Sequence, residues 1–323
     1  MVKNAVLFPG QGAQYPGMGK DFYDASSKVR ELFEIASDMS KVDIRRLLFT
    51  GSADELKQTE VTQPAVTAVN IAAWYFLQEN GITGDAFAGF SLGELSAFHA
   101  AGILKVEDLF LLAGIRGRLM ARAARVAEEQ NGELGMAAVI GLNYEKVAQL
   151  LENIGIDHLY PANDNSELQV VLSGLKKSID QAIPMLKENG ARRIIPLKVS
   201  APFHTPLLTI ARETFTEEIS AVEFANPTSP VYTTVTGELI ASGAEAKKFC
   251  SQQLTAPVRW TGIVQNLSGE RYPMLESCYE AGPGKVLSGF WKSAGVSIAC
   301  SPAGTVEAVQ NFTGQKYVRD GYA

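Results

Sequence analysis

A chain of 323 residues exceeds the size at which one hydrophobic core usually stops growing, so the length predicts a large domain with a smaller inserted or appended one. The net charge of −6 and the lack of any lysine or arginine block argue against nucleic acid as a partner, and no stretch approaches the roughly 18 apolar residues of a membrane span. The three cysteines, Cys250, Cys278 and Cys300, form no C-x-x-C pair, and the first residues lack a signal-peptide core. We therefore expect free thiols, no metal site and a cytoplasmic protein.

The chain opens with a pattern typical of a buried strand at residues 5–8, which ends at Pro9-Gly10. The loop that follows is rich in glycine, but Tyr15 stands where a dinucleotide-binding G-x-G-x-x-G motif needs its third glycine. The amides of such a loop can instead supply a donor to an oxyanion hole. Helical patterns then follow at 26–39, 44–48 and 65–79, the last with Pro64 near its first position.

Residues 89–94 read Gly-Phe-Ser-Leu-Gly-Glu and fit G-x-S-x-G, the pattern of a nucleophile on a sharp turn between a strand and a helix. A short apolar strand pattern at 85–88 precedes this motif, and a helical period follows Ser91. That helix would direct its N-terminal amides at Ser91 and favour an oxyanion there. A plain glycine-rich turn is the alternative, because the bare pattern can arise by chance among 29 glycines. The flanking strand and helix favour a nucleophile.

A long helix is predicted at 106–127, with Arg116 among its apolar residues. An arginine in this position must extend to solvent or meet an anion, because burying it unpaired is too costly. From the residues alone, extension to solvent is slightly favoured.

From Gly135 the pattern becomes β-α-β-β-α-β, which is the ferredoxin-like motif. The predicted elements are strands at 136–140, 159–162, 168–172 and 192–197, helices at 144–153 and 175–189, and a turn at 163–166. We predict an inserted domain at 128–198 and a larger catalytic domain formed by 1–127 and 199–323. The substrate cleft is expected at the seam between the two domains.

Only three histidines are present, so the base for Ser91 can be sought by elimination. His99 lies two turns along the same predicted helix and cannot reach back, and His158 falls in a connection where a surface position is expected. His204 follows a strand that crosses between the domains and lies in a loop between two prolines. We predict that His204 is the base, and the alternative is a solvent-exposed loop histidine.

The rest of the chain is predicted to alternate between helices and strands. The helices are expected at 211–221, 245–254, 258–267 and 286–293, and the strands at 231–235, 275–279 and 296–299. The tail after Gly314 is polar, and we expect it to be loosely held.

These residues resemble the malonyl-CoA:acyl carrier protein transacylases of fatty acid synthesis and the acyltransferase domains of polyketide synthases. The likeness follows nearly the whole chain in order, and its stretches are highly specific together although the serine motif alone is not. They are residues 8–12, 62–65, 89–94, 116–117, 135–138, 169–171, 200–204, 253–260 and 282–285. The resemblance implies an α/β-hydrolase-like domain with a parallel sheet and a ferredoxin-like insertion, in agreement with the element order above.

The resemblance also implies roles for particular residues. Ser91 would be the nucleophile and His204 its general base, oriented by a backbone carbonyl at Gln253. The amides of Gln11 and Leu92 would form the oxyanion hole.

Two further residues would set the substrate. Arg116 would hold the malonyl carboxylate, which replaces the solvent-facing interpretation, because guanidinium and carboxylate pair in a bidentate manner. Phe203 matches the position where malonyl-selective members carry phenylalanine. Two departures from the family pattern are Phe90, where a histidine is usual, and Glu167, where a proline is common.

The activity implied is transfer of a malonyl group from malonyl-CoA to the phosphopantetheine thiol of acyl carrier protein, through a malonyl-serine ester and without metal or cofactor. We expect a monomer with no nucleic-acid or membrane partner. One alternative is a free-standing acyltransferase that serves a polyketide synthase. A serine thioesterase or esterase would not need Arg116, and a docking module without activity would not need Ser91 and His204.

Overall fold

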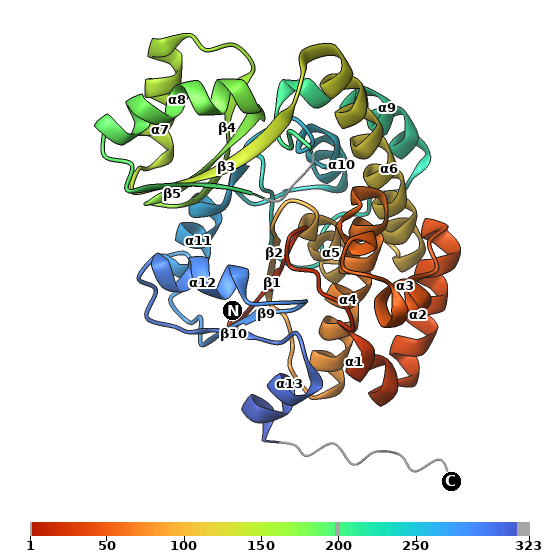
Figure 1. The fold of residues 1–323 in the computed structure, drawn as a ribbon. Helices are drawn as coiled ribbons and strands as arrows, with labels where there is room; N and C mark the ends of the chain where they lie inside the picture. The colour runs from red at the N-terminus through yellow and green to blue at the C-terminus, as the bar shows by residue number, and fades with distance from the viewer. Residues whose placement is uncertain (1, 198–200, 315–323) are drawn as a thin grey trace.

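The computed structural model describes residues 2–197 and 201–314, and two five-stranded sheets organise this part of the chain (Figure 1). The first sheet is parallel throughout, in the order β10-β9-β1-β2-β7. Its strands are β1 (Asn4–Phe8), β2 (Ala86–Gly89), β7 (Val231–Tyr232), β9 (Ser277–Glu280) and β10 (Cys300–Pro302). The central strands β1 and β2 are almost wholly buried, which explains why they read as continuous apolar runs.

Helices cover this sheet on both sides (Figure 1). They are α1 (Lys20–Ala25), α2 (Ser27–Ser40), α3 (Ile44–Thr50), α4 (Thr59–Glu79), α5 (Gly93–Ala100), α6 (Val106–Asn131), α9 (Thr209–Glu218), α10 (Gly243–Gln252), α11 (Trp260–Ser268), α12 (Val286–Ser293) and α13 (Val306–Thr313). Helix α4 is buried on nearly all sides and packs along α6. The long α6 thereby carries its middle turns into the interior of the larger domain.

The second sheet contains the ferredoxin-like unit. Its strands are β3 (Leu134–Ile140), β4 (Leu159–Ser166), β5 (Gln169–Leu175) and β6 (Arg193–Pro196), with helices α7 (Tyr144–Ile154) and α8 (Lys176–Glu188). The strands pair antiparallel in the order β6-β3-β5-β4, and both helices lie on the outer face (Figure 1). This topology and the parallel sheet confirm the predicted fold class.

A segment from beyond the insertion completes the second sheet. Strand β8 (Val258–Arg259) pairs in parallel with β4, and α11 begins only at Trp260, so the helix predicted from 258 was wrong at its start. Thr261 donates to the carboxylate of Asp164 at 2.6 Å across the same contact. The larger domain is therefore tied to the inserted sheet through β4.

Three other predicted elements were misplaced. The asparagines at 163–166 suggested a turn, but pairing with β5 keeps this segment in β4, and the turn falls at residues 167–168. Helix α4 begins at Thr59, so Pro64 lies inside it rather than at its first position. The last strand is β10 at 300–302, not 296–299.

The predicted domain boundaries remain a prediction. The one at 127–128 falls within α6, whereas the junction at 198–199 and the tail after Gly314 lie outside the described residues. None of the helices in the described part of the chain has an apolar stretch of the length that a membrane span requires. All three cysteines are buried and free, as predicted.

Candidate active site

The turn between β2 and α5 places Ser91 just beyond the carboxyl end of β2 in the parallel sheet. Ser91 has a left-handed backbone with φ 51°, which costs a non-glycine residue conformational energy and is typical of functional positions. The two motif glycines are required by close packing. A Cβ on Gly89 would lie 2.0 Å from the carbonyl of Gly93, and one on Gly93 would lie 2.0 Å from the carbonyl oxygen of Phe8.

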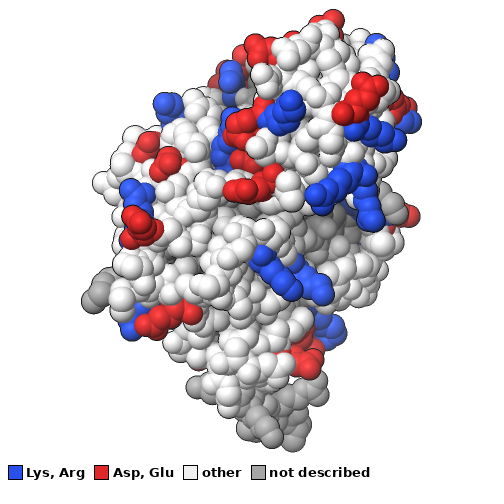
Figure 2. All heavy atoms as spheres, turned by 90° about the vertical axis from the view of Figure 1, so that its left-hand side faces the viewer, with Lys and Arg blue, Asp and Glu red and all other residues white. Residues whose placement is uncertain are grey.

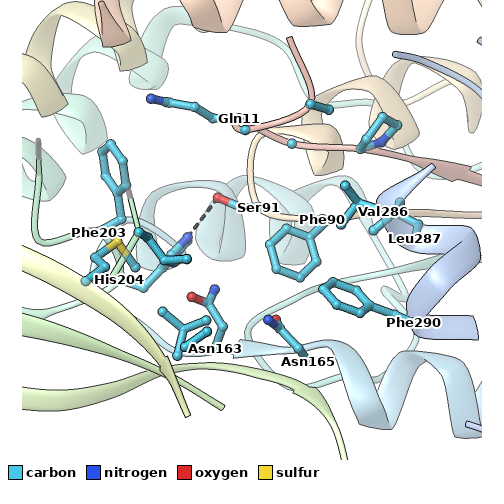
Figure 3. Close-up of a pocket in the computed structure, with 18 of the residues that line it drawn as sticks. Gln11, Phe90, Ser91, Asn163, Asn165, Phe203, His204, Val286, Leu287 and Phe290 are labelled. Atoms are coloured by element: carbon cyan, nitrogen blue, oxygen red, sulfur yellow. Dashed lines mark hydrogen bonds between the residues drawn. The ribbon is translucent and has the colours of Figure 1, made fainter. Parts of the chain in front are cut away.

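His204 lies against Ser91, with 2.8 Å between Nε2 and the serine Oγ (Figure 3). Its Nδ1 lies 2.8 Å from the carbonyl oxygen of Gln253 and 3.2 Å from that of Ala256. Because carbonyl oxygens only accept, Nδ1 carries the proton and Nε2 accepts from the Ser91 hydroxyl. Burial, reinforced by the charge of Arg116, lowers the pKa of His204 to about 4. The imidazole is therefore neutral at pH 7 and able to take the serine proton.

Arg116 projects from α6 into the same place and is only 2% exposed, so its extension to solvent is excluded. Nη1 donates to Oε1 of Gln63 at 2.8 Å, and Nη2 donates to Oε1 of Gln253 at 2.9 Å and to Ser91 Oγ at 3.3 Å. Burial lowers the pKa of Arg116 to about 10, which leaves it cationic at pH 7. Its Nε has no partner within the described residues. The guanidinium is thus held by neutral acceptors beside the serine.

Two backbone amides near Ser91 are available as donors. Within the described parts of the chain, the amides of Gln11 and Leu92 donate to no other group, whereas the Gln11 side chain bonds Thr59. Gln11 and His204 lie on opposite sides of Ser91 (Figure 3). Their assignment to an oxyanion hole stays a prediction.

These groups line a cavity of about 270 Å³ between the two sheets. The cavity is bordered by Gln11, Ser91, Arg116, Phe203 and His204. Leu92 and Gln253 do not line it, and Gln253 contacts His204 through its backbone carbonyl. The opposite wall comes from the inserted sheet and α12 and includes Asn163, Asn165, Gln169, Val171, Val286, Leu287 and Phe290 (Figure 3).

Comparison with known proteins agrees with this geometry. The acyl transferase domain family matches residues 6–274. The chain is 37% identical to the malonyl CoA-acyl carrier protein transacylase of Bacillus subtilis (strain 168), covering 97% of this chain and 98% of that protein. It is 34% identical to the Staphylococcus aureus (strain MRSA252) enzyme of the same name, over 97% and 99% of the two chains. The chain belongs to the malonyl-CoA:acyl carrier protein transacylase family.

Solved structures give the same result. The transacylase of Streptococcus pneumoniae superimposes with a TM-score of 0.88 at 35% identity, over 97% of this chain and 99% of that one. A malonyl-transacylase in complex with a type II polyketide synthase acyl-carrier protein superimposes with a TM-score of 0.89 at 31% identity, over 97% and 100%. The fold of this transacylase is therefore that of the family.

The two departures from the family pattern lie in different places. The ring of Phe90 packs against Trp260 and Phe290, with centroids 5.5 and 6.0 Å away, and gives the transacylase cavity an apolar wall. Glu167 lies in the exposed turn between β4 and β5 and does not line the cavity.

Four polar residues of this transacylase site were not predicted from the sequence. Gln63 accepts from Arg116, and Glu94 accepts from Gln253. Both lie in stretches that resemble the family, but their residue types alone indicated no partner. Asn163 and Asn165 reach the cavity from β4, and the predicted turn concealed their strand-like alternation. An acidic residue in the buried first turn of the helix after Ser91 was the signal that could have indicated Glu94.

Proposed function

We propose that this protein transfers the malonyl group of malonyl-CoA to the phosphopantetheine thiol of acyl carrier protein in fatty acid biosynthesis. The observation that carries the proposal is the buried guanidinium of Arg116, whose Nη2 lies 3.3 Å from the oxygen of the candidate nucleophile. A hydrolase of neutral esters gains nothing from such a cation, whereas a carboxylate on the acyl group would pair with it. The names of the relatives support the same activity.

In the acylation step, the Ser91 hydroxyl gives its proton to Nε2 of His204 as Oγ attacks the thioester carbonyl. The amides of Gln11 and Leu92 would hold the negative oxygen of the tetrahedral intermediate. The C–S bond then breaks, and CoA leaves as a thiol with the proton returned by His204.

The second half runs in reverse with a different thiol. The phosphopantetheine thiol gives its proton to His204 and attacks the malonyl ester, and the C–O bond to Ser91 breaks as Oγ recovers that proton. The product is malonyl-acyl carrier protein, and no step needs a metal or a bound cofactor.

The substrate carboxylate would also assist the base. The positive charge of Arg116 contributes, after burial, to the low pKa of His204. A malonyl carboxylate on Arg116 would neutralise much of that charge and make His204 a stronger base when the correct acyl group is bound.

The second candidate is malonyl transfer to a polyketide synthase carrier protein. It is favoured by the likeness to the transacylase solved with a type II polyketide synthase acyl-carrier protein. Both candidates share the acyl site and differ only in the carrier.

On the face in Figure 2, acidic and basic side chains are interspersed on the upper lobe, which supports a protein partner over nucleic acid. We further propose a cytoplasmic monomer, and three free buried cysteines support a reducing compartment.

The position of Phe203 supports a preference for malonyl-CoA over methylmalonyl-CoA as the substrate. Its ring is nearly buried, lines the cavity and directly precedes His204. A methyl group on C2 of the malonyl unit would meet this ring, because C2 must lie between Ser91 and Arg116.

The test is intact-protein mass spectrometry after incubation with malonyl-CoA and no acceptor. The native protein should gain one malonyl group, and Ser91→Ala should gain none. Parallel samples with methylmalonyl-CoA should label more slowly. A malonyl adduct that maps to a cysteine would refute the assignment of Ser91.

A further inference from the structure

Behind Arg116 lies a fully buried carboxylate that makes no direct contact with the cavity. Glu94, in the first turn of α5, is 0% exposed. Its Oε2 accepts from the amide and the hydroxyl of Thr234, at 2.5 and 2.7 Å. Its Oε1 accepts from Nε2 of Gln253 at 3.1 Å.

Gln253 connects this carboxylate to both parts of the site. Its amide nitrogen donates to Glu94, so its amide oxygen is turned to Arg116 and accepts from Nη2 at 2.9 Å. Its backbone carbonyl accepts from His204 Nδ1. No ion pair joins Glu94 to Arg116 directly among the described residues, and the Glu94 carboxyl lies one side chain away from the guanidinium. A carboxylate at that distance favours the charged form of Arg116.

We infer that Glu94 is a positioning residue for substrate selection: it fixes the amide of Gln253 so that an oxygen faces Arg116, and thereby presents the guanidinium to the substrate carboxylate. This inference rests on the proposed function. It gives a role to the last residue of the Gly-Phe-Ser-Leu-Gly-Glu motif.

Glu94→Gln tests this orientation with almost no change in volume. The amide of Thr234 can only donate, so the new side chain must keep its oxygen there and turn its NH₂ toward Gln253. Gln253 must then rotate its own amide to accept, which places an NH₂ against Nη2 of Arg116. We expect kcat/KM for malonyl transfer to fall roughly ten- to a hundredfold, and for acetyl transfer to change less than about threefold.

Two further variants separate this role from loss of folding. Gln253→Met removes the amide but keeps the backbone carbonyl for His204, and it should lower the malonyl-to-acetyl ratio similarly. The two substitutions combined should lower the ratio little further, because both act through one hydrogen bond.

The matched control is Glu280→Gln. Glu280 is also 0% exposed, but it accepts from the amides of Leu287 and Ser288 at the start of α12 and touches neither Arg116 nor Gln253. Glu280→Gln should lower the urea midpoint of unfolding and leave the malonyl-to-acetyl ratio of kcat/KM unchanged.

An unchanged ratio in Gln253→Met, or in folded Glu94→Gln, would overturn the inference, as would additive effects in the double variant. If the native protein transfers no malonyl group, the proposed function fails instead, so the two failures are distinguishable.

Discussion

Two histidines of this transacylase have the same kind of hydrogen-bond partners. Nδ1 of His204 bonds a backbone carbonyl and Nε2 bonds the hydroxyl of Ser91 at 2.8 Å. Nδ1 of His99 bonds the carbonyl of Leu104 at 2.9 Å, and Nε2 bonds the hydroxyl of Tyr75 at 3.0 Å. Both rings therefore carry the proton on Nδ1, and burial lowers the pKa of both.

The difference lies in what surrounds each pair. Ser91 and His204 both have left-handed backbones, with φ 51° and 61°, and both line the cavity between the sheets. Tyr75 and His99 lie on the ordinary helices α4 and α5 and do not line that cavity. A hydroxyl–imidazole–carbonyl chain is therefore no catalytic site by itself. Three features distinguish the Ser91 site: the strained turn, the cavity and the buried guanidinium of Arg116 that lines it.

The largest effect is expected from replacing His204, the histidine of the pair that lines the cavity. His204→Ala should lower kcat/KM for malonyl transfer by about 10⁴- to 10⁶-fold, because Ser91 loses its proton acceptor. Rates should be measured with radiolabelled malonyl-CoA and purified acyl carrier protein, after circular dichroism has established folding. A loss below about tenfold would show that another group accepts the proton.

Removal of the buried guanidinium of Arg116, which lies beside Ser91, comes next. Loss of one partner of a buried charge pair costs roughly 2–5 kcal/mol, so Arg116→Ala should lower malonyl transfer by tens to thousands of fold. Acetyl-CoA has no carboxylate to pair with Arg116 and should gain in relative rate, and Arg116→Lys should be intermediate because it keeps the charge but loses the fork.

The readout is the malonyl-to-acetyl ratio in the three proteins, each checked for folding. The same ratio in native and Arg116→Ala protein would mean that the substrate carboxylate has another partner.

A smaller effect concerns stability against pH. The pKa of His204 is about 4 in the folded protein and 6.5 in the reference state. Between pH 6.5 and 4 only the unfolded chain takes up this proton, so the free energy of unfolding falls as the pH drops. The pKa of Glu94 is raised by burial from 4.5 to about 7, so its contribution has the opposite sign over nearly the same window. Each group changes the free energy of unfolding by about 1.4 kcal/mol per pH unit within its window. The two changes have opposite signs and should nearly cancel in the native protein.

Urea unfolding at pH 4.5, 5.5 and 6.5 can separate the two groups. Relative to native protein, Glu94→Gln should lose stability as pH falls, and His204→Ala should gain it. Parallel curves for all three proteins would contradict both shifted pKa values.

Local pattern explains why much of this molecule could be predicted. The serine turn, the βαββαβ order and a base sought among three histidines all follow from short stretches, and the structure brings Ser91 and His204 together. Those residues needed no knowledge of distant packing, because the chain carries few histidines and the turn is marked by glycines.

The remainder depends on contacts between distant segments. Arg116, Gln253 and Glu94 meet only after α5, α6 and α10 have packed. The local residue pattern therefore favoured solvent for Arg116, and only the family resemblance indicated a carboxylate partner. Asn163 and Asn165 have turn propensity, and pairing with β5 overrides it. Strand β8 has two residues, too few for an alternating pattern to reveal.

The smallest expected effect comes from the second hydroxyl–imidazole pair. Tyr75→Phe removes the donor to Nε2 of His99 and keeps the ring, so it should cost about 1 kcal/mol of stability, the usual contribution of one hydrogen bond. Malonyl transfer should stay within about twofold of native, because neither residue borders the cavity. Urea unfolding and the transfer assay on the same preparation measure both quantities. A tenfold slower transfer at unchanged stability would mean that this pair acts on the reaction, and the contrast between the two histidines would no longer hold.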